Sequence, residues 1–178
     1  VKMSGQTVTI NGRDGAFTGY LASPGSGRGP GLVVIQEIFG VNQVMREVAD
    51  GMASRGYYAL VPDLFWRLEP GVQLTDKTDA DWKKAFDLLN RFNIDKGIAD
   101  IQAAIDHVRA LPGCTGKVGA LGYCLGGQLA YLTAARTDSD ASVGYYGINI
   151  QSRLNEADKI KNPLMLHIAE ADEYVPSE

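Results

Sequence analysis

The fold is decided by the stretch KVGALGYCLGG, residues 117–127. Residues 117–122 have the composition of a buried strand, and residues 124–135 have that of a helix. The pentad between them, Gly122-Tyr123-Cys124-Leu125-Gly126, follows the pattern Gly-x-Cys-x-Gly. Only small residues around such a turn let the strand and the helix approach closely. The context is that of a nucleophile elbow, a sharp turn that lifts a reactive side chain above the sheet.

Outward from this stretch, apolar strands alternate with segments of helical periodicity. Residues 31–35, GLVVI, form a continuous run that is typical of a strand buried on both faces. The patterns predict further strands at 57–61, 141–146 and 163–168, and helices at 42–55, 79–90 and 98–110. Such alternation indicates a mostly parallel α/β sheet flanked by helices. Residues 6–10 and 17–22, on either side of two Gly-containing turns, predict an N-terminal hairpin.

The composition is that of one ordinary domain, residues 1–178. Hydrophobic residues make up 45% of the chain and charged residues 21%, with a net charge of −4, which favours one globular unit with a sizeable core. The sequence has no basic patch of the kind that binds nucleic acid. No apolar run approaches the roughly 18 residues that a membrane span needs. The N-terminus lacks the pattern of a signal or transit peptide, so a cytoplasmic location is expected.

The two ends of the sequence bear on its extent. The chain starts on Val1 rather than Met, and its last four residues read Val-Pro-Ser-Glu. Pro and Ser followed by an acidic residue are typical of the first turn of a helix. We therefore expect the single domain 1–178 to lack its C-terminal part.

The chain has two cysteines, Cys114 and Cys124. They are too few for a disulfide scaffold and form no zinc pattern, so we expect a reduced compartment and no bound metal. At a helix N-terminus the dipole and the backbone N–H groups favour the thiolate, which makes Cys124 a candidate nucleophile. Its alternative interpretation is a small buried hydrophobic side chain. Cys114 has no such setting and is interpreted as incidental.

Three segments resemble the dienelactone hydrolases, a carboxymethylenebutenolidase-like family with the α/β-hydrolase fold. They are QEIFGVN at 36–42, GYCLGG at 122–127 and GYYG at 144–147. The similarity runs from about residue 31 to residue 176. It implies an α/β-hydrolase fold and a cysteine-dependent hydrolase of a small ester or lactone, with neither a metal nor an organic cofactor.

The resemblance also implies roles for individual residues. The backbone N–H groups of Ile38 and Leu125 would form an oxyanion hole. Glu37 would hold the resting thiol of Cys124 through a hydrogen bond until substrate displaces it, although a solvated loop carboxylate is its alternative interpretation. Asp172 matches the acid of the catalytic triad, with two neighbouring carboxylates, Glu170 and Glu173, as rivals.

The histidine of the triad has no obvious candidate. His107 and His167 are the two histidines of the sequence, and neither follows the acid, as the order of this fold requires. The first falls within a predicted helix and the second within a strand expected to be buried, so both are interpreted as structural. The resemblance places the catalytic histidine beyond residue 178.

Four aromatic residues, Phe39, Trp82, Tyr145 and Tyr146, would line the substrate pocket, with ordinary core packing as the alternative. Trp82 stands where the resemblance implies an arginine that holds a substrate carboxylate, and an indole does not replace a guanidinium clamp. Nearby cations that could take its place are Lys83, Lys84 and Arg91. An ester or lactone other than the anionic dienelactone is therefore equally acceptable.

Two other functions are compatible with these patterns. One is a non-catalytic protein that keeps the pocket and binds a small ligand. The other is a thiol redox protein that uses Cys124, with Cys114 as the available resolving partner, although no Cys-x-x-Cys motif supports it. The expected partner is a small-molecule ester or lactone, and the expected assembly is a monomer or a small homo-oligomer.

Overall fold

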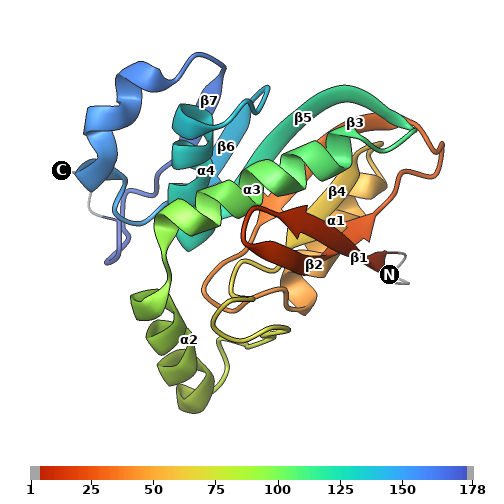
Figure 1. Cartoon of the computed structure of the whole chain (residues 1–178). Coiled ribbons are helices and arrows are strands. Elements are labelled where there is room, and N and C mark those ends of the chain that lie inside the picture. The colour runs from red at the N-terminus through yellow and green to blue at the C-terminus, as the bar shows by residue number, and fades with distance from the viewer. Residues whose placement is uncertain (1–4, 176–178) are drawn as a thin grey trace.

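A computed structural model describes residues 5–175 of the chain. Its seven strands form one sheet in the order β1-β2-β4-β3-β5-β6-β7, shown in Figure 1. The strands are β1 (Gln6–Gly12), β2 (Gly15–Ala22), β3 (Gly29–Ile35), β4 (Tyr58–Pro62), β5 (Cys114–Tyr123), β6 (Ser142–Tyr145) and β7 (Leu164–His167). The helices are α1 (Gln43–Ala53), α2 (Asp79–Arg91), α3 (Ile94–Arg109), α4 (Leu125–Arg136) and the 3-10 helix η1 (Ile150–Lys159).

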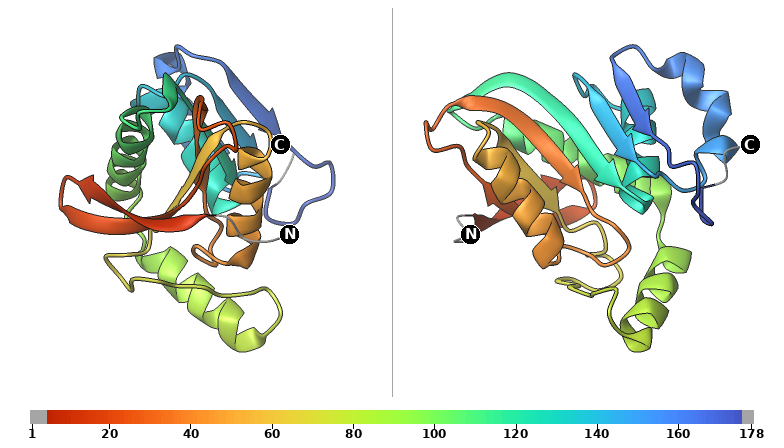
Figure 2. Two further views of the ribbon diagram at one scale, coloured as in Figure 1. Left: turned by 90° about the vertical axis from the view of Figure 1, so that its right-hand side faces the viewer. Right: turned by 180° about the vertical axis from the view of Figure 1, so that it is seen from behind.

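The sheet is mostly parallel and is covered on both faces. The β1–β2 hairpin is antiparallel and joins β4, whereas β4, β3, β5, β6 and β7 run parallel. On one face, Met45 and Ala49 of α1 belong to the same hydrophobic cluster as Val34 of β3. On the other face α3 and α4 lie side by side and share a core with Val33 and Ile35 (Figure 2). The α/β architecture and the N-terminal hairpin expected from the sequence are confirmed.

Three features differ from the sequence-based expectation. Helix α3 begins at Ile94 rather than at residue 98, because Asn93 caps it by accepting the backbone N–H of Lys96. The 3-10 helix η1 was not expected, since its mostly polar sequence lacks an apolar period. Strand β7 was expected to be buried, but Met165 is 57% exposed because β7 pairs only with β6 among the described residues. The helix start expected at 176–178 lies outside the described residues.

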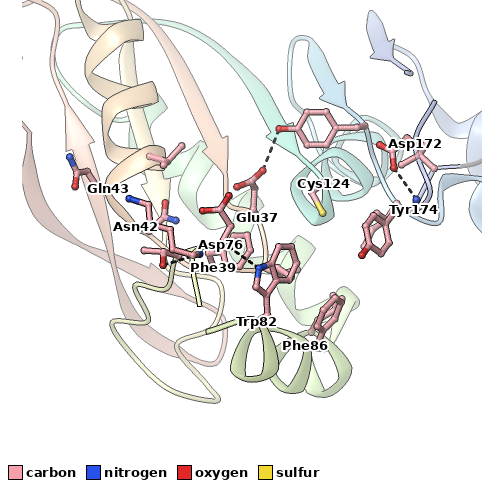
Figure 3. Close-up of a pocket in the computed structure, with 18 of the residues that line it drawn as sticks. Glu37, Phe39, Asn42, Gln43, Asp76, Trp82, Phe86, Cys124, Asp172 and Tyr174 are labelled. Carbon is pink, nitrogen blue, oxygen red and sulfur yellow. Dashed lines mark hydrogen bonds between the residues drawn. The ribbon is translucent and has the colours of Figure 1, made fainter. Parts of the chain in front are cut away.

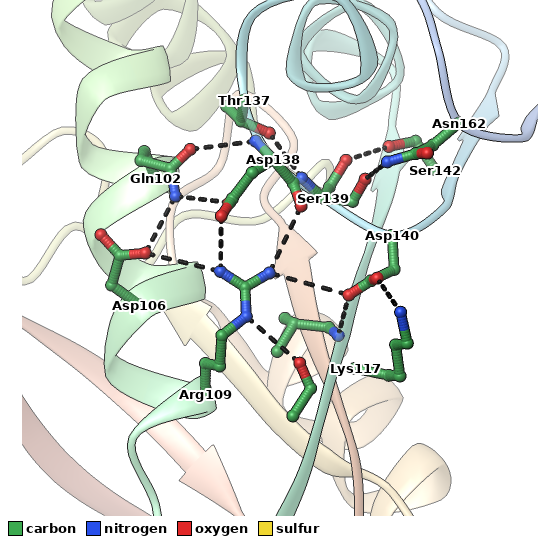
Figure 4. A network of polar contacts seen from close by, with 12 residues as sticks. Gln102, Asp106, Arg109, Lys117, Thr137, Asp138, Ser139, Asp140, Ser142 and Asn162 are labelled. Carbon is green, nitrogen blue, oxygen red and sulfur yellow. Dashed lines mark hydrogen bonds and ion pairs between the residues drawn. The ribbon is translucent and has the colours of Figure 1, made fainter.

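A polar network joins α3 to the end of β5 that is remote from the elbow (Figure 4). Arg109 of α3 donates to the side chain of Asp138 at 2.8 Å and to the Gly116 carbonyl oxygen at 3.2 Å. Asp140 accepts the backbone N–H of Val118 at 2.8 Å and pairs with Lys117 at 2.9 Å. These contacts hold the N-terminal end of β5 in place. Cys124 follows the opposite, C-terminal end of the strand.

Helix η1 is held to α4 by a two-point ion pair. Arg136 donates to both carboxylate oxygens of Glu156, at 2.8 and 2.6 Å, and the Glu156 side chain is only 6% exposed. The guanidinium holds the pKa of Glu156 at about 2, against the usual 4.5. Because this folded-state pKa is depressed, the pair stabilises the fold above about pH 4.5, and the contribution is lost as the pH falls through about 2.

We expect Glu156→Gln to lower the free energy of unfolding at pH 7 by about 3 kcal/mol, because Arg136 then keeps a half-buried charge without its main partner. The measurement is urea unfolding followed by circular dichroism at pH 7 and at pH 3. Asp95→Asn is the matched control, since Asp95 pairs with the same guanidinium from an 82% exposed position and should cost little. Equal losses in the two variants would contradict the prediction.

Candidate active site

The backbone of the elbow is strained at the candidate nucleophile. Cys124 stands between β5 and α4 with φ 57° and ψ −114°, a conformation that a residue with a side chain rarely adopts. A Cβ on Gly122 would overlap the carbonyl oxygen of Gly126, and one on Gly126 would meet the Ile35 carbonyl oxygen. The two glycines therefore allow the close approach that the strained turn requires.

The register of the sheet brings a second loop to the elbow. β3 pairs in parallel with β5, and Ile35 lies opposite Gly122. The chain leaves β3 directly into Glu37 and Ile38, so both residues lie at the same edge of the sheet as Cys124. Ile38 lies outside the helices and strands, and within residues 5–175 its backbone N–H donates to no backbone carbonyl. It is a suitable donor to a bound oxyanion.

A cavity of about 780 Å³ opens over the elbow (Figure 3). It brings together most of the residues selected from the sequence, namely Glu37, Ile38, Phe39, Trp82, Cys124, Tyr146 and Asp172. A volume of this size suits a small organic ligand. The rivals Glu170 and Glu173 do not line it.

One of the selected residues is placed differently. Tyr145 was expected to line the pocket, but its ring is stacked between those of Tyr123 and His167, with centroids 5.1 and 4.3 Å away. Tyr146 directly follows β6 with a positive φ of 39°, and its side chain rather than that of Tyr145 lines the cavity. Leu125 is buried, and its backbone N–H lowers the pKa of the Cys124 thiol.

Glu37 does not bond the thiol in this state. Its Oε1 accepts a hydrogen bond from the Tyr146 hydroxyl at 3.3 Å, whereas a bond to Cys124 was expected. Burial raises the pKa of Glu37, and the Tyr146 hydrogen bond opposes that shift. Burial of the ring and the same carboxylate raise the pKa of Tyr146. The carboxylate thus acts on Cys124 through space, without a hydrogen bond.

Cys124 rests as a thiol. Burial is the main cause that raises its pKa to about 11, and the negative charges of Glu37 and Asp172 add to the shift. The Leu125 N–H acts in the opposite direction, because it stabilises the thiolate. The sulfur therefore needs a proton acceptor, or a change in these charges, before it can attack at neutral pH.

Neither histidine of the sequence lies in the cavity. His107 is on α3, and His167 stacks on Tyr145 at the exposed end of β7. Asp172 lines the cavity, and its Oδ1 accepts the backbone N–H of Tyr174 at 2.9 Å. The described residues thus supply a thiol and a carboxyl group to the cavity, but no imidazole.

An aromatic wall forms the side of the cavity that α2 provides. Trp82 meets Phe39 edge to face at 5.1 Å between centroids and stacks on Phe86 at 5.6 Å. The indole N–H donates to the Asp76 carbonyl oxygen at 2.9 Å. Phe86 was not selected as a pocket residue from the sequence, although its i+4 spacing from Trp82 places it on the same face of the predicted helix.

The loop before α2 also supplies lining residues that sequence reasoning missed. Asp76 and Lys77 come from a segment interpreted only as a loop, 63–78. Leu74 donates its N–H to the Phe39 carbonyl oxygen at 2.9 Å, and Asn42 donates its side-chain amide to the Leu74 carbonyl oxygen at 3.0 Å. These bonds hold the loop at the mouth, and no local sequence pattern predicts them.

Among the described residues no group of His, Cys, Asp and Glu side chains could hold a metal ion. No helix in the same part of the chain is long and apolar enough to cross a bilayer.

Comparison with known proteins places the chain in a family. The family model described as "Dienelactone hydrolase family" matches residues 17–178. The chain belongs to the dienelactone hydrolase family. The expected family, and with it the enzyme class of hydrolase, is thereby confirmed.

Relatives within the dienelactone hydrolase family are close. A "Putative carboxymethylenebutenolidase" of Azospirillum brasilense is 50% identical over 171 residues, which cover 94% of this chain and 72% of the relative. The "Carboxymethylenebutenolidase" of Pseudomonas putida is 39% identical over 171 residues, with 96% of this chain and 72% of the relative covered.

Solved structures agree on the fold. The crystal structure of a "Putative Dienelactone Hydrolase" from Klebsiella pneumoniae superposes with a TM-score of 0.73 at 21% identity, covering 94% of this chain and 86% of that one. An "Alpha/beta hydrolase" from Penicillium gives a TM-score of 0.63 at 18% identity, with 85% and 50% covered. The α/β-hydrolase fold expected from the sequence is confirmed.

We expect Glu37→Gln to speed the alkylation of Cys124 by iodoacetamide about threefold or more at pH 8, because a nearby negative charge that raises the thiol pKa is removed. The measurement is the rate against pH by intact mass, in a Cys114→Ser background so that a single thiol reports. The pH midpoint, about 11 before the change, should fall. Glu170→Gln is the control, since Glu170 lies outside the cavity lining, and unchanged rates in Glu37→Gln would contradict the prediction.

Proposed function

We propose that the chain is a cysteine-dependent hydrolase of small esters or lactones that works through an acyl-enzyme on Cys124. The thiolate attacks the carbonyl carbon, and a tetrahedral oxyanion forms. The C–O bond then breaks, the alkoxide takes a proton and leaves as the alcohol, and a thioester remains. Water attacks this thioester, the C–S bond breaks, and the carboxylic acid and the thiol are released.

The backbone around the elbow would stabilise the oxyanion. The proposal is supported by the positions of the Ile38 and Leu125 N–H groups, because Ile38 follows β3 and Leu125 begins α4 directly after Cys124, at the same edge of the sheet. Backbone donors held in place in this way cost no reorganisation as charge develops. Removing one such donor from a hydrolase typically costs about 10²–10³-fold in kcat.

The proton acceptor is assigned to a histidine beyond residue 178, oriented by Asp172. This follows the order nucleophile, acid, histidine of the fold. It is supported by the position of Asp172 in the lining of the cavity, which neither His107 nor His167 joins. With the acceptor in place, the thiol proton moves to the imidazole, which returns it to the leaving alcohol.

The observation that carries the proposal is the strained backbone of Cys124 at the floor of the cavity. A merely structural cysteine needs no such conformation. Redox exchange with Cys114 does not account for it, because Cys114 and Cys124 flank opposite ends of the ten-residue strand β5. At about 3.3 Å per residue they lie roughly 30 Å apart, far beyond the reach of a disulfide.

The test is a 4-nitrophenyl acetate assay with intact-mass detection, on the chain 1–178 and on a form extended to the end of its gene. The proposal predicts turnover in the extended form, and an acetyl adduct that maps to Cys124. Cys114→Ser should keep both signals. Inactivity of both forms, with ligand binding retained, would overturn the hydrolase and favour the binding protein.

A further inference from the structure

The charges that line the cavity are mostly negative. Among residues 5–175, its lining includes four residues with a carboxylate, Glu37, Glu47, Asp76 and Asp172, and one with an ammonium group, Lys77. A cleft lined by one sign of charge focuses its field on the ligand. This field opposes the entry of an anion.

Other cations near the cavity are engaged elsewhere. Lys84 pairs with Glu69 at 2.7 Å, and Arg91 pairs with Asp87 at 2.8 Å. Arg46 of α1 donates to the Val41 carbonyl oxygen at 2.7 Å and to Gln73 at 2.6 Å. None of the three, nor Lys83, lines the cavity. Within residues 5–175, therefore, no guanidinium is available to bind a substrate carboxylate by two parallel hydrogen bonds.

The aromatic wall favours an uncharged group. Phe39, Trp82 and Phe86 present a contiguous apolar surface from two separate elements. The one donor in this wall, the indole N–H of Trp82, is already bonded to the Asp76 carbonyl oxygen. A carboxylate placed against the wall would lose its hydration without gaining a hydrogen bond there.

We propose that this cavity selects uncharged esters and lactones with an apolar or aromatic group, and discriminates against substrates that carry a carboxylate. The inference deepens the proposed function and rests on it. It predicts that carboxymethylene-substituted lactones, which are anions at neutral pH, react more slowly than neutral esters of similar size.

The test uses the form extended beyond residue 178 and a matched pair of substrates, the 4-nitrophenyl ester of monomethyl glutarate and the 4-nitrophenyl monoester of glutaric acid. They differ in one charge at the far end of the acyl chain. We expect kcat/KM for the neutral ester to exceed that for the anionic one by about tenfold or more at low salt. Raising the ionic strength from about 0.01 to about 0.15 M shortens the screening length from about 30 to about 8 Å and should narrow this ratio.

Charge variants identify the origin of the ratio of kcat/KM between the neutral and the anionic ester. Glu47→Gln and Asp76→Asn should each raise the relative rate with the anionic ester about twofold to threefold, and Trp82→Arg should raise it further. Asp87→Asn makes the same change of charge on α2 outside the cavity lining, so it should leave the ratio unaltered. The Glu47 and Asp76 variants keep the test valid if Trp82→Arg does not fold.

The outcomes are separable. Hydrolysis of both esters with equal efficiency, or preference for the anion, would overturn the selectivity while leaving the hydrolase intact. A ratio that responds to Asp87→Asn as strongly as to Asp76→Asn would also overturn it, because the field of the cavity would then not be its cause. Hydrolysis of neither ester, with no adduct on Cys124, would refute the proposed function itself.

Discussion

Cys124→Ala is expected to lower kcat/KM for a neutral 4-nitrophenyl ester by about 10⁴-fold or more, because residues that act as one catalytic unit lose nearly all of their effect together. The loss should fall mainly on kcat, since the aromatic wall and the rest of the cavity remain. The acyl adduct seen by intact mass should disappear in the same variant.

Two companion variants separate chemistry from folding. Cys114→Ala, at the far end of β5, should keep its activity. Cys124→Gly should be as inactive as Cys124→Ala yet about 1 kcal/mol more stable, because glycine adopts a positive φ without strain. Residual turnover above a few per cent in Cys124→Ala would show that another group attacks the ester.

Gly122→Ala is expected to lower the free energy of unfolding by roughly 3 kcal/mol or more, and to abolish turnover in any protein that folds. A Cβ at this position would overlap the backbone carbonyl of Gly126, and a backbone atom cannot move aside as a flexible side chain can. Relief requires that α4 withdraw from β5, which carries Cys124 away from Ile38.

The measurement is urea unfolding, with Gly25→Ala as the control. A Cβ on Gly25 meets no atom within 4 Å, so this variant should stay within about 0.5 kcal/mol of the parent chain. A folded, active Gly122→Ala protein would mean that the tight turn is not required for the position of the nucleophile.

The sheet was predictable because its signals are local. The sequence of the run Gly31–Ile35 predicts a strand, and that of the pentad around Cys124 predicts a tight turn. The strands β3 and β5 then pair in parallel, as expected of buried strands in an α/β sheet. The parts that were missed depend on tertiary contacts. Helix η1 is held by Arg136, which lies 20 residues from Glu156, and no local period records such a contact.

The site, like the fold, was predictable only where local sequence determines it. Its floor, formed by Glu37, Ile38 and Cys124, follows from two motifs at strand ends. Its mouth does not, because Asp76 and Lys77 arrive there through hydrogen bonds between two loops. The bond from Tyr146 to Glu37 spans 109 residues, so only the folded chain shows that Glu37 is engaged away from the thiol.

The position of β3 in the sheet also sets the order in which the site comes apart. β3 lies between β4 and β5, and Val33, Val34 and Ile35 are fully buried. We expect the amide hydrogens of this centre to belong to the slowest-exchanging unit, which opens only on global unfolding. Within residues 5–175, Asp172 follows β7, whose side chains are half-buried or exposed, so we expect it to belong to a unit that opens at lower free energy. A partial opening would therefore detach the acid while the nucleophile kept its place.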